Sequence, residues 1–158
     1  MDTASAFHAF QAVLDVMGTR ESLAFLLKFT DYRFIGLWRF QNGRAHAAIH
    51  YDRENPSETQ AQEVADTDTY CCYVRDGQGV FMTAHAMLDP RTEGHSAREA
   101  VAAYCGVPVM DSEGNILATL CHYDVVPRDP SQVDLELMIQ VASALAQGDH
   151  VPPYPAAA

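Results

Sequence analysis

The chain has 158 residues, of which 48% are apolar and 20% are charged, and these values are typical of one soluble globular domain. Its formal net charge of −11, with Lys28 as the only lysine, disfavours nucleic acid and anionic membranes as partners, because an acidic surface repels phosphate groups. No apolar run is long enough to cross a bilayer, and the N-terminus lacks the features of a secretory signal, so we expect a cytoplasmic protein.

Two helices are predicted at the N-terminus. Apolar residues recur at helical spacing between residues 4 and 17, and Gly18 is a natural end for this helix. The positions that form its apolar stripe are Phe7, Phe10, Val13, Leu14 and Met17. A second helix is expected from Arg20 to Phe29, with Thr19 as its cap.

A β-hairpin is predicted for residues 32–51, since Asn42-Gly43 suits a two-residue type I′ turn. In this register Leu37 lies opposite Ala48. One face of the hairpin then carries Phe34, Trp38, Phe40, Ala45, Ala47 and Ile49. The other face carries Ile35, Leu37, Arg39, His46, Ala48 and His50.

The middle of the chain is predicted to alternate between loops and short elements. Residues 52–66 form a polar, acidic connection, which either covers a pocket or is solvated surface. A short helix is expected from Asp68 to Arg75, followed by a strand at 80–86 and a loop at 88–97.

A second hairpin is predicted around the turn at 111–114. If Asp111 lies opposite Gly114, Cys105 pairs with Leu120, and Cys105 and Cys121 project from opposite faces. Both faces of this hairpin are largely apolar, which indicates a sheet that is covered on both sides. We therefore expect no intramolecular disulfide, least of all between Cys105 and Cys121.

The last helix is predicted to begin at Asp129-Pro130 and to end at Gly148. Residues 149–158 are expected to form a disordered tail, so that a single domain covers residues 1–148. The order of the elements predicts an α+β fold, in which a mostly antiparallel sheet carries terminal helices on one face and short helices and loops on the other.

Three segments of the chain resemble the GAF domain family. They are "DTYCCYVRDGQGVFMTAHAMLDPR" (68–91), "AYCGVPVMDSEGNILATLCHYD" (103–124) and "LELMIQVASALA" (135–146), within a resemblance that runs from residue 5 to residue 147. The resemblance implies a six-stranded antiparallel sheet of the GAF/PAS-like type. It also implies a small-molecule pocket on one face of the sheet and frequent dimerisation through the terminal helices.

The residues that hold cofactors in some GAF domains are absent or differently placed here. The Asn-Lys-Phe-Asp-Glu set of cyclic-nucleotide-binding members is missing. Bilin-binding members carry a Cys-His pair before a strand, whereas Cys121-His122 ends a predicted strand. Haem or iron ligation by one of His85, His95 and His122 stays open, since all three lie near loop ends, and the cofactor is therefore unknown.

GAF-like reductases of free methionine-(R)-sulfoxide are the enzyme alternative. Their chemistry needs two cysteines that approach within disulfide distance. These enzymes carry a reactive cysteine in a Gly-His-Ile-Ala-Cys loop, whereas residues 94–100 read GHSAREA and contain none. Cys71 and Cys72 are adjacent and point apart on a helix, so the cysteines are more simply explained as buried apolar residues.

The sequence favours a stand-alone sensory module that binds a small molecule and signals through association with a partner protein, with the methionine sulfoxide reductase as the alternative. The terminal helices can cover only one face of the sheet, so short elements and loops cover the other and leave a concave site. Its predicted border is Trp38, Tyr70, Cys71, His85, Tyr104 and Cys121. The acidity of the chain favours a neutral or cationic ligand, and the apolar first and last helices predict a homodimer.

Overall fold

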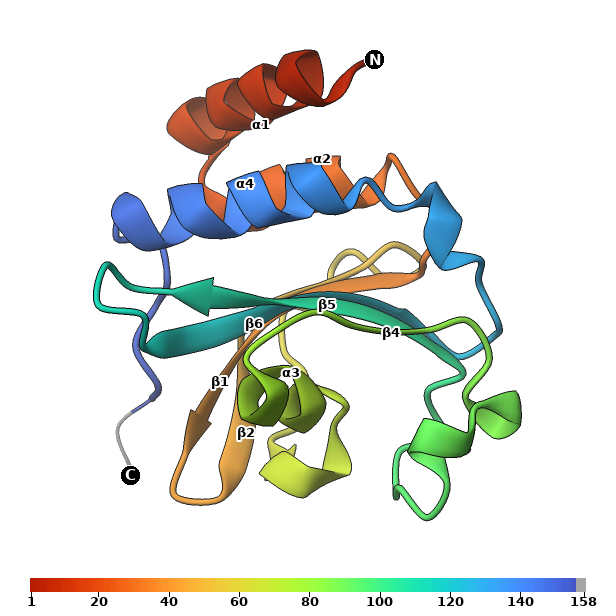
Figure 1. Ribbon diagram of the computed structural model, residues 1–158. Coiled ribbons are helices and arrows are strands. Elements are labelled where there is room, and N and C mark those ends of the chain that lie inside the picture. The colour runs from red at the N-terminus through yellow and green to blue at the C-terminus, as the bar shows by residue number, and fades with distance from the viewer. Residues whose placement is uncertain (156–158) are drawn as a thin grey trace.

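The computed structural model describes residues 1–155 and shows one antiparallel sheet between two layers of other elements (Figure 1). Its six strands lie in the order β3-β2-β1-β6-β5-β4. They are β1 (Phe34–Gln41), β2 (Arg44–Asp52), β3 (Val64–Ala65), β4 (Phe81–Thr83), β5 (Ala103–Met110) and β6 (Ile116–Asp124). The two long hairpins meet at the centre of the sheet, where β1 pairs with β6, and the predicted α+β architecture is confirmed.

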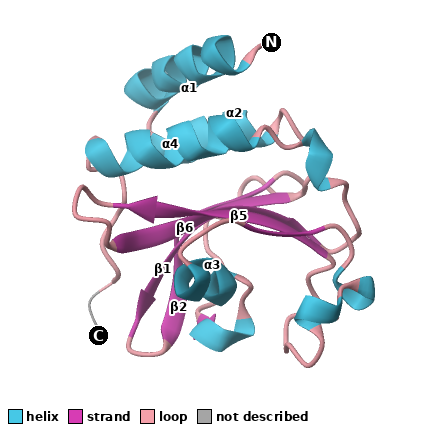
Figure 2. Ribbon diagram, in the orientation of Figure 1, coloured by secondary structure: helices cyan, strands magenta, loops and turns pink. Residues whose placement is uncertain are grey.

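Long helices cover one face of the sheet and short ones cover the other (Figure 2). The four α-helices are α1 (Thr3–Met17), α2 (Thr19–Leu27), α3 (Cys71–Gly77) and α4 (Leu135–Gln147). Helices α2 and α4 lie against the sheet and α1 lies outside them, while α3 and the 3-10 turns at 66–68, 86–88 and 90–92 lie on the opposite side. Among the described residues, no helix combines the length and the apolar character that a bilayer-spanning segment needs.

The N-terminal helices meet at a glycine. Helix α1 begins after Asp2, whose carboxylate accepts a hydrogen bond of 2.7 Å from the backbone N–H of Ser5. It ends at Gly18, where φ is +91°, a value that favours glycine. The prediction that Thr19 caps α2 is wrong, because Gly18 turns the chain sharply enough that Thr19 is already the first helical residue.

The last helix begins later than predicted. Asp129-Pro130 opens a separate 3-10 turn at 130–132, in which the carboxylate of Asp129 accepts a hydrogen bond from Ser131. Helix α4 starts after Asp134, whose carboxylate accepts a 3.0 Å hydrogen bond from the N–H of Leu137. Proline suits the first turn of either helix type, so the Asp-Pro signal marks a turn here rather than the helix itself.

A bulge in β2 moves two side chains to faces other than those predicted. The turn at Asn42-Gly43 forms with positive φ at both residues, as expected. Leu37, however, pairs with Ile49 instead of Ala48, because Ala48 is an extra residue in β2. Ile49 therefore packs against the helix-side core, and His50 faces the opposite side of the sheet.

The β5–β6 hairpin is shifted by two residues from the predicted register, since Cys105 pairs with His122. The turn is longer than predicted: the carboxylate of Asp111 accepts a 2.9 Å hydrogen bond from the N–H of Asn115, and a bulge precedes the turn. A shift of two residues leaves the side chains from Cys105 to Val109 and from Ala118 to Cys121 on their predicted faces. Cys105 and Cys121 therefore lie on opposite sides of the sheet, as predicted. At the bulge, Leu117 is an extra residue of β6 and packs against the helix-side core instead of the opposite face that was predicted.

The C-terminal segment packs against the domain as far as it is described. Val151 is buried in the helix-side core, and the guanidinium of Arg39 donates a 3.1 Å hydrogen bond to the carbonyl of Pro152. We expected residues 149–158 to form a disordered tail, whereas Val151 and Pro152 make ordered contacts with the domain. Residues 156–158 of that tail lie outside the described part of the chain.

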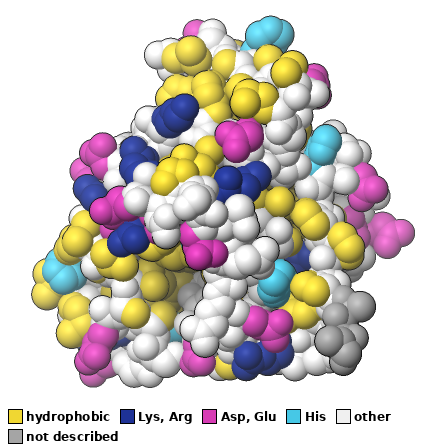
Figure 3. All heavy atoms as spheres, turned by 180° about the vertical axis from the view of Figure 1, so that it is seen from behind, with side chains coloured by type: hydrophobic (Ala, Val, Ile, Leu, Met, Phe, Trp, Pro, Cys, Tyr) yellow, Lys and Arg dark blue, Asp and Glu magenta, His cyan; other side chains and the backbone are white. Residues whose placement is uncertain are grey.

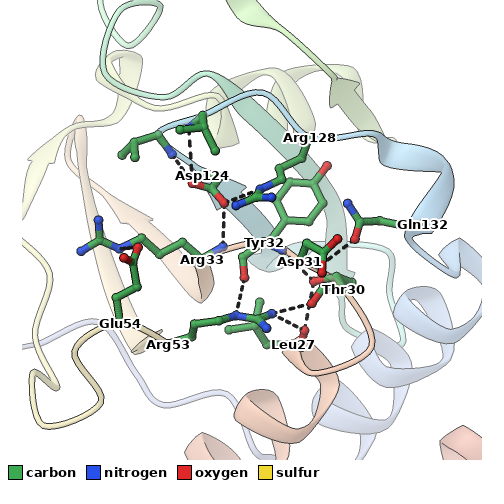
Figure 4. Close-up of polar contacts among 12 residues, drawn as sticks. Leu27, Thr30, Asp31, Tyr32, Arg33, Arg53, Glu54, Asp124, Arg128 and Gln132 are labelled. Carbon is green, nitrogen blue, oxygen red and sulfur yellow. Dashed lines mark hydrogen bonds and ion pairs between the residues drawn. The ribbon is translucent and has the colours of Figure 1, made fainter.

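Arg53 holds the end of α2 against the sheet (Figure 4). Its guanidinium donates hydrogen bonds to the backbone carbonyls of Leu27 (2.8 Å), Thr30 (2.6 Å) and Tyr32 (2.8 Å). A cation at this position satisfies carbonyls that a helix leaves unpaired at its C-terminal end. Arg53 therefore ties the helical layer to β2.

Asp124, at the end of β6, organises the same corner of the molecule (Figure 4). Its buried carboxylate accepts hydrogen bonds from the backbone N–H of Arg33 (2.9 Å), the backbone N–H of Val125 (2.7 Å) and Nε of Arg128 (2.8 Å). One side chain thus joins the start of β1 to the chain that leaves β6.

Candidate functional site

A cavity of about 250 Å³ lies between the sheet and the layer formed by α3 and its flanking loops. Its lining residues are mostly apolar or aromatic: Trp38, His50, Ala61, Gln62, Val64, Asp68, Thr69, Tyr70, Cys71, Ala97, Val101, Tyr104, Cys121 and Tyr123. The central strands supply the floor of the cavity, and the acidic connection between β2 and β3 supplies part of its wall.

Two glycines shape the floor of the cavity. In the sheet, Cys121 lies between Gly36 of β1 and Gly106 of β5. Because neither glycine has a side chain, the rings of Trp38 and Tyr104 fold over them. A Cβ atom on Gly36 would lie 2.6 Å from Nε1 of Trp38, and one on Gly106 would lie 2.6 Å from Cε1 of Tyr104. The glycines are therefore required for these two rings to lie where they do.

A neutral hydrogen-bonded pair lies beside the floor. The hydroxyl of Tyr123 and Nε2 of His50 are hydrogen-bonded, and the indole of Trp38 lies edge-on to the imidazole at 6.4 Å. Burial lowers the pKa of His50 and raises the pKa of Tyr123 well above its ordinary value. Both groups are therefore uncharged near pH 7, so the phenol donates and the imidazole accepts.

Two thiols and a phenol meet at the base of the cavity. The Sγ atoms of Cys71 and Cys121 are 4.0 Å apart, and the hydroxyl of Tyr104 donates a hydrogen bond of 3.2 Å to Sγ of Cys71. Burial raises the pKa of Cys121 and of Tyr104 well above their ordinary values. Burial also disfavours the thiolate of Cys71, but hydrogen bonds from Cys121 and Tyr104 outweigh it, and the pKa of Cys71 is lowered.

The cavity lining offers no cation. Neither lysine nor arginine is among the described residues that line it, and Asp68 places a carboxylate at its exposed rim. An anionic ligand would therefore lose its hydration without gaining an ion pair.

Five of the six residues predicted to border the pocket line this cavity: Trp38, Tyr70, Cys71, Tyr104 and Cys121. The sixth, His85, follows β4 and is not among the lining residues. The prediction missed His50 because the bulge in β2 that turns it toward the cavity has no local signal. It also missed Tyr123, which strand alternation from Cys121 would have placed on the same face. That these residues bind a ligand stays a prediction.

The histidines considered as iron ligands do not converge on one site. His122 points to the helix side, where it stacks on Tyr32 at 5.7 Å, and burial lowers its pKa to about 3. His95 lies on the cavity side, with Nε2 3.8 Å from Sγ of Cys72. In the part of the chain that the structure describes, no group of three His, Cys, Asp or Glu side chains is arranged to hold a metal ion.

Sequence comparison finds one partial relative. No protein-family model matches the chain. A cyclic di-GMP phosphodiesterase of Pseudomonas aeruginosa, PA2567, is 38% identical over 66 residues, which are 40% of this chain. The matched part spans only 11% of that protein.

Structure comparison finds GAF domains. The GAF domain of an Acinetobacter phosphoenolpyruvate-protein phosphotransferase superposes with a TM-score of 0.73 and 12% identity over 93% of each chain. A phycocyanobilin-bound GAF domain of a cyanobacterial phytochrome gives 0.70 and 11% identity over 95% of this chain and 94% of its own. The free methionine-R-sulfoxide reductase of Neisseria meningitidis gives 0.70 and 12% identity over 92% and 86%. Because each superposition extends over at least 92% of this chain, the resemblance seen in the sequence is confirmed and the protein has the GAF domain fold.

Proposed function

We propose that this protein is a sensory module that binds a small, largely apolar, neutral or cationic molecule in the cavity below the sheet. The observation that carries the proposal is the cavity itself, about 250 Å³ in volume and built on two glycines at the centre of the sheet. Among the similar structures, the cyanobacterial GAF domain is bound to phycocyanobilin, which supports ligand binding by this fold.

The chemistry of the lining defines the ligand class. Drug-sized ligands occupy about 300–1,000 Å³, so the cavity suits a smaller metabolite. The rings of Trp38, Tyr104 and Tyr123 offer apolar and π surface, and the two phenol oxygens can accept hydrogen bonds while their protons are donated to Cys71 and His50. The absence of a cation among the described lining residues, together with the carboxylate of Asp68, selects against phosphates and carboxylates.

Freshly purified protein is expected to carry a bound small molecule, seen as additional mass by native mass spectrometry. The Ala97→Phe variant is expected to show no additional mass, because Ala97 is buried against the cavity and a phenyl ring there would fill the space that the ligand needs. Ala4→Phe, on the exposed surface of α1, is the matched control and should retain the additional mass. Equal occupancy of the two variants would place the ligand elsewhere.

A reductase is the second candidate, and one observation favours it. Cys71 and Cys121 approach each other within a cavity, as the reduction of a sulfoxide by two thiols requires. The loop at residues 94–100, however, lacks the cysteine that GAF-like methionine sulfoxide reductases carry there, so we prefer the sensory role. Consumption of dithiothreitol with free methionine sulfoxide, lost in Cys71→Ser, would establish the reductase.

We propose that the module signals by association with proteins. The segment shared with a cyclic di-GMP phosphodiesterase supports a role in signalling. Because the match covers only 11% of that enzyme, we do not propose its phosphodiesterase activity for this chain. Phe10 and Leu14, from the apolar stripe of the first helix on which the predicted homodimer rested, are buried within the protomer. Val16 and Met17 remain 84% and 61% exposed at the end of α1, and apolar side chains gather at this helical end of the molecule (Figure 3).

Self-association is proposed to use the outer surface of α1 and α4. A groove of about 830 Å³ runs between the two helices, and we propose that a second copy of the helix pair packs against it. Light scattering at micromolar concentration should give the mass of a dimer, and Met17→Glu should shift it toward a monomer, because a carboxylate would enter the seam. A monomer mass for the unmodified protein would contradict the dimer.

A further inference from the structure

We propose that Cys71 and Cys121 form a redox-active dithiol, which a hydroperoxide entering the cavity oxidises to a disulfide. Their Sγ atoms are 4.0 Å apart, although the residues are 50 positions apart in the chain. Cys71 begins α3 and Cys121 lies in β6, so the two thiols approach from opposite walls of the cavity. A disulfide needs an Sγ–Sγ distance of about 2.05 Å, so closing the bond requires a movement of roughly 2 Å.

No other side chain lies between the two sulfurs, because at 4.0 Å they are in contact. The residues beside Cys121 in the sheet are Gly36 and Gly106, over which the rings of Trp38 and Tyr104 fold. Tyr104 contacts Sγ of Cys71 through its hydroxyl and thereby fixes this thiol over the floor. The hydrogen bond from Tyr104 also stabilises a thiolate at Cys71, which makes Cys71 the attacking sulfur.

The other two cysteines have different neighbours. Sγ of Cys72 lies 3.8 Å from Nε2 of His95, and Sγ of Cys105 lies 4.0 Å from Sδ of Met138 on the helix side of the sheet. All four cysteines are free in the structure. The expectation of no disulfide is kept for Cys105 and Cys121, which lie on opposite sides of the sheet, and is replaced by the proposal for Cys71 and Cys121. The proposal concerns the oxidised form of the protein.

The reaction takes two steps and consumes one peroxide. The sulfur of Cys71 attacks one oxygen of the hydroperoxide, the O–O bond breaks, and the products are a sulfenic acid and an alcohol, or water if the oxidant is hydrogen peroxide. The sulfur of Cys121 then attacks the sulfenic sulfur, and the hydroxyl leaves as water with the proton of Cys121. Two thiols lose two electrons in total, and the peroxide gains them.

Both thiols line the cavity, so a small oxidant reaches them without unfolding of the protein. The bond would tether α3 to the central strand and thereby fix one wall of the cavity. The proposal uses the cavity only as an entry path, so it does not depend on the identity of a resident ligand or on the sensory role.

Peptide mapping of the oxidised, unmodified protein tests the proposal without any variant. The reduced protein is treated with hydrogen peroxide, alkylated in denaturant and cleaved before aspartate. This cleavage separates fragment 68–75, with Cys71 and Cys72, from fragment 111–123, with Cys121, and from fragment 89–110, with Cys105. A cross-link between 68–75 and 111–123 is expected, with loss of two of the four alkylated thiols and recovery in dithiothreitol.

Single variants assign the cross-link to one of the adjacent cysteines. Cys72→Ser is the matched control and should still lose two of its three thiols, whereas Cys71→Ser and Cys121→Ser should each keep all three. The proposal is overturned by four alkylated thiols in the peroxide-treated protein, by a cross-link that contains fragment 89–110, or by a cross-link that persists in Cys71→Ser.

Discussion

Gly106→Ala is expected to lower the free energy of unfolding by about 2 kcal/mol, because it overpacks the centre of the sheet. The new Cβ would lie 2.6 Å from Cε1 of Tyr104, a distance that real structures do not tolerate. The ring of Tyr104 cannot simply turn away, since it is buried and packs against Tyr70 at 5.6 Å and Phe81 at 6.1 Å. Urea denaturation of the variant beside the unmodified protein measures the loss.

Gly77→Ala is the matched control for this substitution. A Cβ on Gly77 meets no atom within 4 Å, and the residue lies in α3 with no positive φ. Alanine there should be neutral or stabilise the protein by up to about 1 kcal/mol, through the smaller entropy of the unfolded chain. Equal midpoints for the two variants would show that the ring of Tyr104 does not depend on Gly106.

Asp124→Ala is expected to cost about 3 kcal/mol of stability, because a buried carboxylate with several donors disappears. The backbone N–H groups of Arg33, Val125 and Val126 lose their acceptor, and the guanidinium of Arg128 loses its ion pair. Arg128 is partly exposed, so water offsets some of the cost of losing its ion pair, and most of the loss of stability comes from the three backbone donors. The melting temperature should fall by several degrees.

Two further variants separate this role from a general effect of charge. Asp124→Asn keeps the oxygen that accepts from Val125 but not the one that accepts from Arg33 and Arg128, so its cost should be intermediate. Asp15→Ala removes an exposed carboxylate from α1 and should change stability by less than about 0.5 kcal/mol. If Asp124→Ala behaved like Asp15→Ala, the contacts of Asp124 drawn in Figure 4 would not hold the start of β1 to the chain that leaves β6.

Elements with strong local signals were predictable from the sequence. The alternation of apolar residues in the two hairpins, the turn at Asn42-Gly43 and the glycine at 18 lead to the observed strands and helices. Most faces of the β5–β6 hairpin were also predicted correctly despite a register error, because a shift of two residues keeps a side chain on its own side of the sheet. Leu117, at the bulge, is an exception. Five of the six residues proposed for the pocket therefore line one cavity.

Features that depend on packing between distant segments were not predictable. The bulge at Ala48 carries no signal in its own residues, yet it decides that His50 faces the cavity. The approach of Cys71 to Cys121 depends on how α3 docks on the sheet, which no periodicity within either segment describes. His85 was wrongly assigned to the pocket for the same reason. The strand predicted to carry it, β4, ends at Thr83, so His85 lies outside the strand and does not line the cavity.

The cavity below the sheet is proposed to take up a small neutral or cationic molecule, and the only tryptophan of the chain, Trp38, lines it. Binding is therefore measured by titrating Trp38 fluorescence with p-cresol, a neutral aromatic probe. We expect a saturable change in fluorescence in the unmodified protein and in Ala4→Phe, no change in Ala97→Phe, and no change with phenyl phosphate in place of p-cresol. A signal in the unmodified protein that does not saturate, or equal saturation in Ala97→Phe, would contradict binding in the cavity.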